Sequence, residues 1–220
     1  MRKRNKLYFV GLASILSLSL VACQSNISSE SVADESLVYV DRDINSTLDP
    51  DKPLTDSYLK RAGAAEALFW VNSKGEVENQ LADKAEQIDD THWKIHLNPK
   101  AKYWSGEPVT ADKVIASYER SKAVNPSVES LLRGLTLTAD SEKEISVVSD
   151  IPGLDVPLNL SKITILNPDK SFESVDQVDL TGPYKIEKFT PKQSLELVRN
   201  DQYYGDLAKI EHVTMQEVSD

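Results

Sequence analysis

The spacing of apolar residues predicts both strands and helices in the first half of the chain. Residues 36–40 form a short apolar run rich in β-branched side chains and are predicted to be a buried strand that opens the core sheet. Apolar residues recur at helical spacing over 56–68, where Gly63 is a weak point. In 91–97 apolar and polar residues alternate, which is the period of a half-buried strand.

A second helix is predicted to begin after Thr110. The Thr110 side chain is suited to capping a helix, and Asp112 falls in the first turn, where the helix dipole favours negative charge. One face of this helix is apolar and contains Ala111, Val114, Ile115 and Tyr118. Asn125-Pro126 is predicted to end the helix.

The second half of the chain has a mostly extended pattern. Strand-like segments separated by turn residues occupy 144–148, 162–166, 184–189, 194–198 and 209–218. Pro191-Lys192 falls between two of them and predicts a hairpin. Strands outnumber helices, but helices lie between some of them, so a mixed α/β or α+β fold is favoured over a β-sandwich.

The amino terminus has the features of an export signal. Four basic residues open the chain, namely Arg2, Lys3, Arg4 and Lys6. The apolar stretch 7–21 that follows is shorter than the roughly 20 residues that cross a bilayer. Leu20-Val21-Ala22-Cys23 resembles a lipobox, the motif in which lipid is attached to the cysteine thiol after export.

We therefore expect three parts in the chain. Residues 1–22 are expected to be a lipoprotein signal peptide, and 23–36 a flexible, serine-rich and acidic tether that carries lipid on Cys23. Residues 37–220 are expected to form the folded part. An ordinary secretory signal with an incidental cysteine is the alternative.

Charge and cysteine content restrict the partners. The chain has 25 basic and 35 acidic residues, and loss of the four positive charges in 1–22 takes the formal charge from -10 to -14. An acidic protein is not attracted to nucleic acid or to anionic lipid, which makes a covalent anchor reasonable. Cys23 is the one cysteine, so the chain cannot form an internal disulfide.

Candidate catalytic motifs are missing from the sequence. It has no glycine-rich phosphate loop, no G-x-S-x-G and no H-E-x-x-H, and only three histidines. His92 and His96 lie in the predicted strand 91–97, where two solvated histidines are favoured over a pair of ligands to one metal ion. Most acidic residues are expected on a solvated face. We expect no enzyme activity, no cofactor and no metal site.

Six aromatic residues could stack on a ligand or pack in a core, and the core interpretation is favoured. They are Trp70, Trp93, Tyr103, Trp104, Tyr203 and Tyr204. Trp104 starts the turn Trp104-Ser105-Gly106-Glu107-Pro108, so its exposure is the hardest to predict.

Several motifs, in this order and spacing, resemble the peptide- and nickel-type (family 5) solute-binding lipoproteins of ABC importers. The motifs are Leu48-Asp49-Pro50, Glu66-Ala67-Leu68-Phe69, Leu81-Ala82-Asp83, Trp93 to Leu97, Tyr103 to Val114 with Tyr118-Glu119-Arg120, Thr181-Gly182-Pro183-Tyr184-Lys185, and Leu197 to Gly205. The resemblance covers nearly all of the expected mature chain.

The resemblance implies a mixed α/β fold that is the N-terminal lobe of a two-lobed, periplasmic-binding-protein-like structure. Three departures are visible: Leu180 stands where a glycine is usual, a tryptophan after Asp83 is missing, and the chain ends at Asp220 where the family continues into a second lobe. We therefore expect a partial lobe.

The implied function is that of a solute-binding component of an ABC importer, anchored in the cell membrane by lipid and facing outward. Its implied partners are ABC permease subunits and a ligand that is an oligopeptide or a nickel or metallophore complex. The alternative is a truncated remnant or surface interaction lipoprotein without high-affinity transport. Position along the family pattern makes Tyr58, Arg61 and Trp104 candidate ligand contacts.

Overall fold

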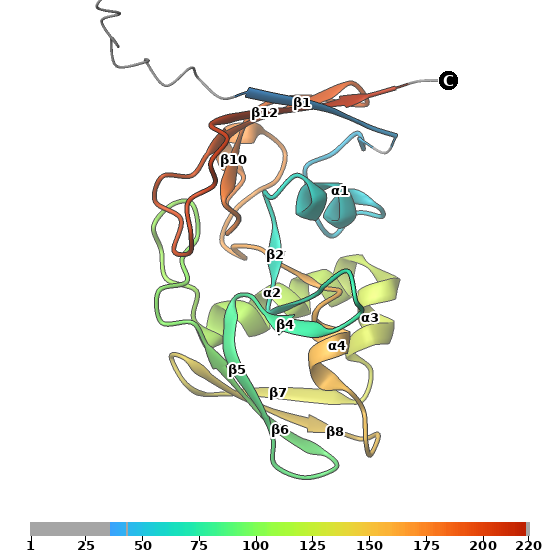
Figure 1. Ribbon diagram of the computed structural model, residues 1–220. Helices are drawn as coiled ribbons and strands as arrows, with labels where there is room; N and C mark the ends of the chain where they lie inside the picture. The colour runs from blue at the N-terminus through green and yellow to red at the C-terminus, as the bar shows by residue number, and fades with distance from the viewer. Residues whose placement is uncertain (1–35, 43, 219–220) are drawn as a thin grey trace, which may run out of the picture. The chain divides into compact units, whose positions relative to one another are not determined.

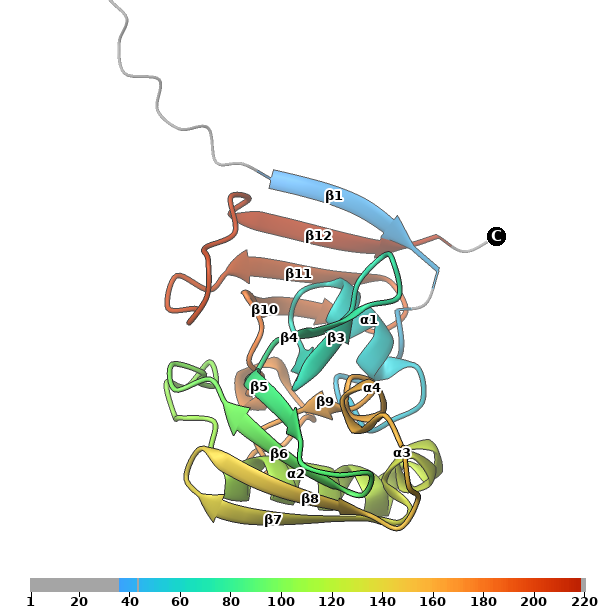
Figure 2. The same cartoon turned by 60° about the horizontal axis from the view of Figure 1, so that its bottom comes forward.

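The computed structural model describes residues 36–42 and 44–218, and these contain two four-stranded sheets (Figures 1 and 2). The predicted signal peptide, Cys23 and nearly all of the tether lie outside the described residues. Within the described part of the chain, no helix has the length and apolar content needed to span a membrane. The mixed α/β class predicted from the sequence is confirmed.

The first sheet brings the first and last described strands together. Its strands, in spatial order, are β1 (Ser36–Asp41), β12 (His212–Glu217), β11 (Ser194–Arg199) and β10 (Tyr184–Thr190). β1 is parallel to β12, whereas the β12–β11 and β11–β10 pairs are antiparallel. The predicted hairpin joins β10 to β11, and Lys192 in its turn has a φ of 56°.

β1 forms where the strand was predicted, but the prediction that it is buried is wrong. It is an edge strand that pairs on one side only, with β12, and the side chains of Val38 and Val40 are 60% and 59% exposed. An apolar run identifies a strand but cannot say whether a second strand or a helix will cover it.

The second sheet is antiparallel throughout and is covered by helices. Its strands, in spatial order, are β5 (Ala82–Gln87), β6 (His92–Leu97), β8 (Glu144–Ser149) and β7 (Leu135–Ser141). The helices α2 (Ala111–Val124) and α3 (Pro126–Leu132) lie against one face of this sheet (Figure 1). The strand predicted over 91–97 is confirmed by the burial of Ile95 and Leu97 between more exposed neighbours.

The limits of α2 follow its sequence signals. The Thr110 hydroxyl accepts a hydrogen bond from the backbone N–H of Lys113, which confirms the predicted cap. The predicted end at Asn125-Pro126 is also confirmed, but the same pair begins α3. The Asn125 side chain accepts from the N–H of Ser127, and Pro126 takes a first-turn position where its missing N–H costs nothing.

The helix predicted over 56–68 is shorter than expected. α1 runs from Thr55 to Arg61 and ends before Gly63, which has a φ of 70°. The chain then enters β2 (Glu66–Ala67), which pairs with β9 (Thr164–Ile165). The strand predicted over 162–166 is therefore reduced to β9, because the rest of that segment connects α4 (Val156–Leu160) to the sheets.

Gly182 allows two distant segments to touch. A Cβ at this position would lie 2.3 Å from the backbone oxygen of Gly63. The N–H of Gly182 donates to Ala64 at 3.1 Å, and that of Tyr184 donates to Gly63 at 3.1 Å. The Thr-Gly-Pro-Tyr motif thus fixes the start of β10 against the end of α1.

The described residues form two apolar cores, and this junction lies within the second of them. One contains β5 to β8 with α2, α3 and α4, and the other contains α1 with β10 to β12. Two smaller elements complete the described residues: the hairpin of β3 (Phe69–Val71) with β4 (Val77–Asn79), and the short 3-10 helix η1 (Val175–Gln177).

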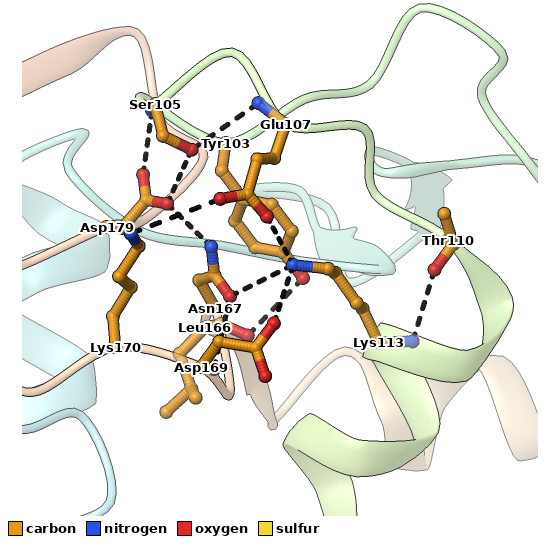
Figure 3. A network of polar contacts seen from close by, with 10 residues as sticks. All are labelled: Tyr103, Ser105, Glu107, Thr110, Lys113, Leu166, Asn167, Asp169, Lys170 and Asp179. Atoms are coloured by element: carbon orange, nitrogen blue, oxygen red, sulfur yellow. Dashed lines mark hydrogen bonds and ion pairs between the residues drawn. The ribbon is translucent and has the colours of Figure 1, made fainter.

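A polar network ties the cores together (Figure 3). The ammonium of Lys113 on α2 contacts Glu107 and lies 3.0 Å from Asp169. The buried carboxylate of Asp179 accepts hydrogen bonds from Ser105 Oγ and Asn167 Nδ2, both at 2.7 Å. These contacts fix the chain after β9 relative to α2, and so fix the two cores relative to each other.

Candidate functional site

Two adjoining hollows lie where the cores meet, and both are lined by Asp56 and Lys162. Their volumes are about 370 Å³ and about 450 Å³. We call the surface that their lining residues form the cleft face. It is the candidate site, because small-molecule sites are concave and combine apolar surface with a few placed polar groups.

The first hollow is lined by apolar and polar residues, and its core residues, Val128, Leu131 and Ile163, come from the core that contains α2 and α3. It lies between the loop before α1, the junction of α2 with α3, and the segment before β9. Its apolar lining residues are Pro50, Pro53, Leu54, Pro126, Val128, Leu131 and Ile163. Because the loop before α1 forms the other wall, the shape of the hollow depends on how this loop is held against α2 and α3.

The second hollow combines cationic groups with an aromatic ring. Lys60 and Asp56, one turn apart on α1, form an ion pair of 3.2 Å. The Lys60 ammonium also donates to the backbone oxygen of Lys162 at 3.3 Å. No ion pair of the Lys162 side chain is present among the described residues, so this exposed cation is available to a carboxylate of a ligand.

Trp70 supplies the aromatic ring of the second hollow. Its side chain is 45% exposed, and its Nε1 donates to Glu78 Oε2 at 3.0 Å across the β3–β4 hairpin. Asn72 Nδ2 donates to the other oxygen of Glu78, at 2.6 Å. The hairpin therefore holds this large side chain in one orientation before any ligand arrives, which lowers the entropy lost on binding.

A loop that lines the first hollow is bound to α2. Arg120 contacts both Asp49 and Asp51, and its Nη1 lies 3.0 Å from Asp49 Oδ1. Asp51 is almost fully buried, and burial raises its pKa although Arg120 lowers it. The guanidinium also lies over the ring of Phe172, 5.1 Å from its centre. Loop residues 49–51 are thus attached to the helix of the opposite core.

Tyr58, a predicted ligand contact, is a core residue in the structure. Its side chain is fully buried and its hydroxyl donates to the backbone oxygen of Thr47 at 2.5 Å. Burial raises its pKa, and the ring packs in the core that contains α1. Contact of Tyr58 with a ligand stays a prediction that this geometry does not support.

Arg61 and Trp104 also lie away from the cleft face. Arg61 makes two hydrogen bonds to the carboxylate of Asp41, at 2.9 and 3.1 Å. Trp104 is partly buried; its Nε1 donates to Gly182 O at 3.0 Å, and it lines a separate hollow of about 290 Å³. Their roles in ligand binding stay predictions, because neither side chain lines the two hollows of the cleft face.

The histidines are not at the site. His92 Nδ1 lies 2.9 Å from Asp89, whereas His96 lies 3.3 Å from Glu86 and 3.2 Å from Glu144. None of the three histidines of the chain lines either hollow. Within the described residues, no group of three or more His, Cys, Asp or Glu side chains could hold a metal ion.

Sequence reasoning missed most of the cleft face. Trp70 was named among six aromatics, but Phe69-Trp70-Val71 is a continuous apolar run without the alternation that marks an exposed position. Lys162 fell inside a predicted strand. Leu54 gave one weak signal, a leucine next to a proline and before a helix start.

The sequence is similar to those of known solute-binding proteins. Residues 76–220 match the model for the middle region of the bacterial extracellular solute-binding proteins, family 5. The chain is 31% identical over 157 residues to the nickel-binding protein NikA of Staphylococcus aureus, a match that covers 70% of this chain and 32% of that protein.

Solved structures show the same fold. A nickel ABC transporter protein from Bacillus halodurans superposes with a TM-score of 0.75 and 26% identity, over 84% of this chain and 39% of that one. NikA from S. aureus, in complex with Ni(L-His)2, gives a TM-score of 0.74 at 24% identity, with the same coverage. The murein tripeptide binding protein MppA of Escherichia coli superposes with a TM-score of 0.70 and 22% identity, over 84% of this chain and 42% of that one.

The chain therefore spans about a third of the curated relative, at 32%, and about two fifths of these solved relatives, at 39–42%. The family model matches more than half of its 220 residues, along the β4–β12 region that contains much of both cores. The chain belongs to the bacterial extracellular solute-binding proteins of family 5.

Proposed function

We propose that this chain captures a small solute on its cleft face and delivers it to an ABC importer. The observation that carries the proposal is the junction of an apolar hollow with a second hollow that presents Lys162 and the fixed ring of Trp70. Such a surface suits a solute that has an apolar part next to a carboxylate. Both hollows are open to solvent, so they leave part of a solute exposed, and we expect weak binding, with a Kd of about 10–1000 μM.

Of the two solute classes, we favour a nickel chelate over an oligopeptide. Support comes from the similarity to NikA of S. aureus, whose structure holds Ni(L-His)2. The cleft face offers no histidine or cysteine, so nickel would arrive with its ligands already in place. The carboxylates of such a chelate, like the carboxylate of a short peptide, match the Lys162 ammonium.

Calorimetry with Ni(L-His)2 and with the tripeptide Ala-Leu-Ala tests the proposal. The chain from residue 24 is suitable, since the described residues form one unit with its own cores. We expect saturable binding of at least one probe. We also expect Lys162→Ala to weaken it about fivefold, because a partly solvated charge pair contributes about 1 kcal/mol.

Lys100→Ala is the matched control, because Lys100 is an exposed lysine that lines neither hollow. Its affinity should equal that of the unaltered chain. Absence of binding of both probes at millimolar concentration, or equal loss in both lysine variants, would contradict a solute site at Lys162.

We further propose that lipid on Cys23 holds the protein at the outer face of the cell membrane, next to the permease. Cys23→Ala should then abolish incorporation of labelled palmitate and release the protein from the membrane fraction, because no other anchor is expected. The folded part should be unaffected, with an unchanged melting temperature. Retention of the variant in salt-washed membranes would show that the anchor is something else.

A further inference from the structure

Leu54, which lines the first hollow, has an unusual backbone conformation. Its φ and ψ are 68° and -11°, in the left-handed region. In the described part of the chain, only Lys192 shares a positive φ without being glycine, and Lys192 is in a hairpin turn. A left-handed leucine is strained because its Cβ approaches the following carbonyl, and it has no polar group to offset this.

Contacts on both sides of Leu54 impose this conformation. The Asn45 side-chain amide donates to the backbone oxygen of Pro53 at 2.6 Å and to Thr55 Oγ1 at 3.0 Å. The Ser57 hydroxyl donates to the backbone oxygen of Leu54 at 2.9 Å. The preceding loop is attached to α2 through Arg120 and Asp51. The strain is therefore maintained by the surrounding network, a pattern that occurs at functional positions.

The side chain of Leu54 contributes little to the fold. It is 66% exposed, so burial gains little stability to set against the strain. It lines the first hollow, together with apolar residues of the loop, the α2–α3 junction and Ile163. Asparagine or glycine would meet the backbone requirement at lower cost. What leucine adds at this position is an apolar surface that faces the hollow.

We propose that Leu54 determines specificity: it contacts an apolar group of the solute, and the network around Asn45 holds it in place for that contact. The inference rests on the proposed function and deepens it, since it assigns the first hollow to an apolar group of the solute and leaves the anionic group to Lys162. Binding then covers the Leu54 side chain, and that burial strengthens the complex.

The test measures affinity and stability together in Leu54→Asn and Leu54→Ala. For whichever of Ni(L-His)2 and Ala-Leu-Ala binds the unaltered chain, we expect Kd to rise about tenfold in both variants. Asparagine tolerates the left-handed region, so Leu54→Asn should also raise the melting temperature by about 2–4 °C. Loss of affinity with a gain in stability distinguishes ligand contact from a structural role.

Leu207→Asn is the control, because Leu207 is 55% exposed and lines neither hollow. It should change neither quantity. Unaltered affinity in both Leu54 variants overturns the inference, and so does a lower melting temperature for Leu54→Asn. If the unaltered chain binds neither probe, the proposed function fails and the inference fails with it; binding by the unaltered chain with no effect of Leu54 leaves the proposed function in place.

Discussion

Arg120→Ala is expected to lower the free energy of unfolding by about 3 kcal/mol, because it leaves the buried Asp51 without its cation. That corresponds to a melting temperature lower by about 6–12 °C for a protein of this size. Arg120 also joins α2 of one core to the loop before α1 of the other, so the cleft face should lose its fixed shape. Thermal unfolding followed by circular dichroism measures the effect.

The loss of stability caused by Arg120→Ala should depend on pH. Burial already raises the pKa of Asp51, and removal of the nearby cation raises it further. A carboxyl group whose folded-state pKa is raised binds more protons in the folded state, so stability falls as pH rises. The variant should therefore lose more stability at pH 8 than at pH 5.

Arg133→Ala is the matched control for Arg120→Ala. Arg133 follows the last residue of α3 and is mostly exposed. Its side chain forms an ion pair of 3.1 Å with Glu129, one turn earlier in the helix. Removal of such a surface pair should change stability by less than about 0.5 kcal/mol. If the two arginine variants unfold at the same temperature, Arg120 does not connect the cores as described.

Glu66→Gln is expected to change how stability depends on pH. Glu66 is 2% exposed on β2, and it accepts hydrogen bonds from Tyr203 at 2.6 Å and Tyr204 at 3.1 Å. Burial raises its pKa from 4.5 to about 7 despite these hydrogen bonds, which lower it. In the unfolded chain the same group titrates near the ordinary value, about 4.3.

The sign of the Glu66 effect follows from that difference. Between pH 4.5 and 7 the folded state holds the proton and the unfolded state does not, so stability falls as pH rises through this window. From pH 5 to pH 8 this contribution falls by about 2–3 kcal/mol. The amide that replaces the carboxyl group in Glu66→Gln does not titrate, so the variant should lose less stability than the unaltered chain over the same interval.

Glu187→Gln controls for the change in net charge, because Glu187 is exposed on β10. Urea unfolding at pH 5, 6, 7 and 8 gives the three profiles. The free energy of unfolding of the unaltered chain and that of Glu187→Gln should change in parallel with pH. The profile of Glu66→Gln should be flatter. Parallel profiles for all three proteins would show that Glu66 is ionised in the folded state over the whole interval from pH 5 to pH 8, which contradicts the raised pKa.

Local sequence signals predicted the elements whose limits depend on local chemistry. Thr110 and Asn125 gave the ends of α2, and alternation around Trp93 gave β6, because a cap or a half-buried strand is specified by residues close in sequence. The helix over 56–68 was too long because Gly63 was treated as tolerable within a helix. It ends α1, since Gly182 and Tyr184 hydrogen-bond with Ala64 and Gly63.

The cleft face could not be predicted in the same way. Lys162 and Asp56 are more than 100 residues apart and meet because β9 pairs with β2, which follows α1. Tyr58 is an aromatic residue of a type that often contacts ligands, but its side chain packs in the core that contains α1. The weak sequence signal of Leu54 did not report its left-handed backbone angles, which identify it in the structure. Long-range pairing and strain are properties of the folded chain.

Binding of the solute at the cleft face can be followed through the indole signals of the three tryptophans. In a ¹⁵N-labelled sample titrated with Ni(L-His)2, and separately with Ala-Leu-Ala, we expect the Nε1–H signal of Trp70 to shift or broaden. The indole signals of Trp93 and Trp104 should not shift, since Trp93 packs against a core and Trp104 Nε1 donates a hydrogen bond to the backbone oxygen of Gly182. A response of Trp104 without Trp70, or no response of Trp70 at saturation, would show that the solute does not bind at this face.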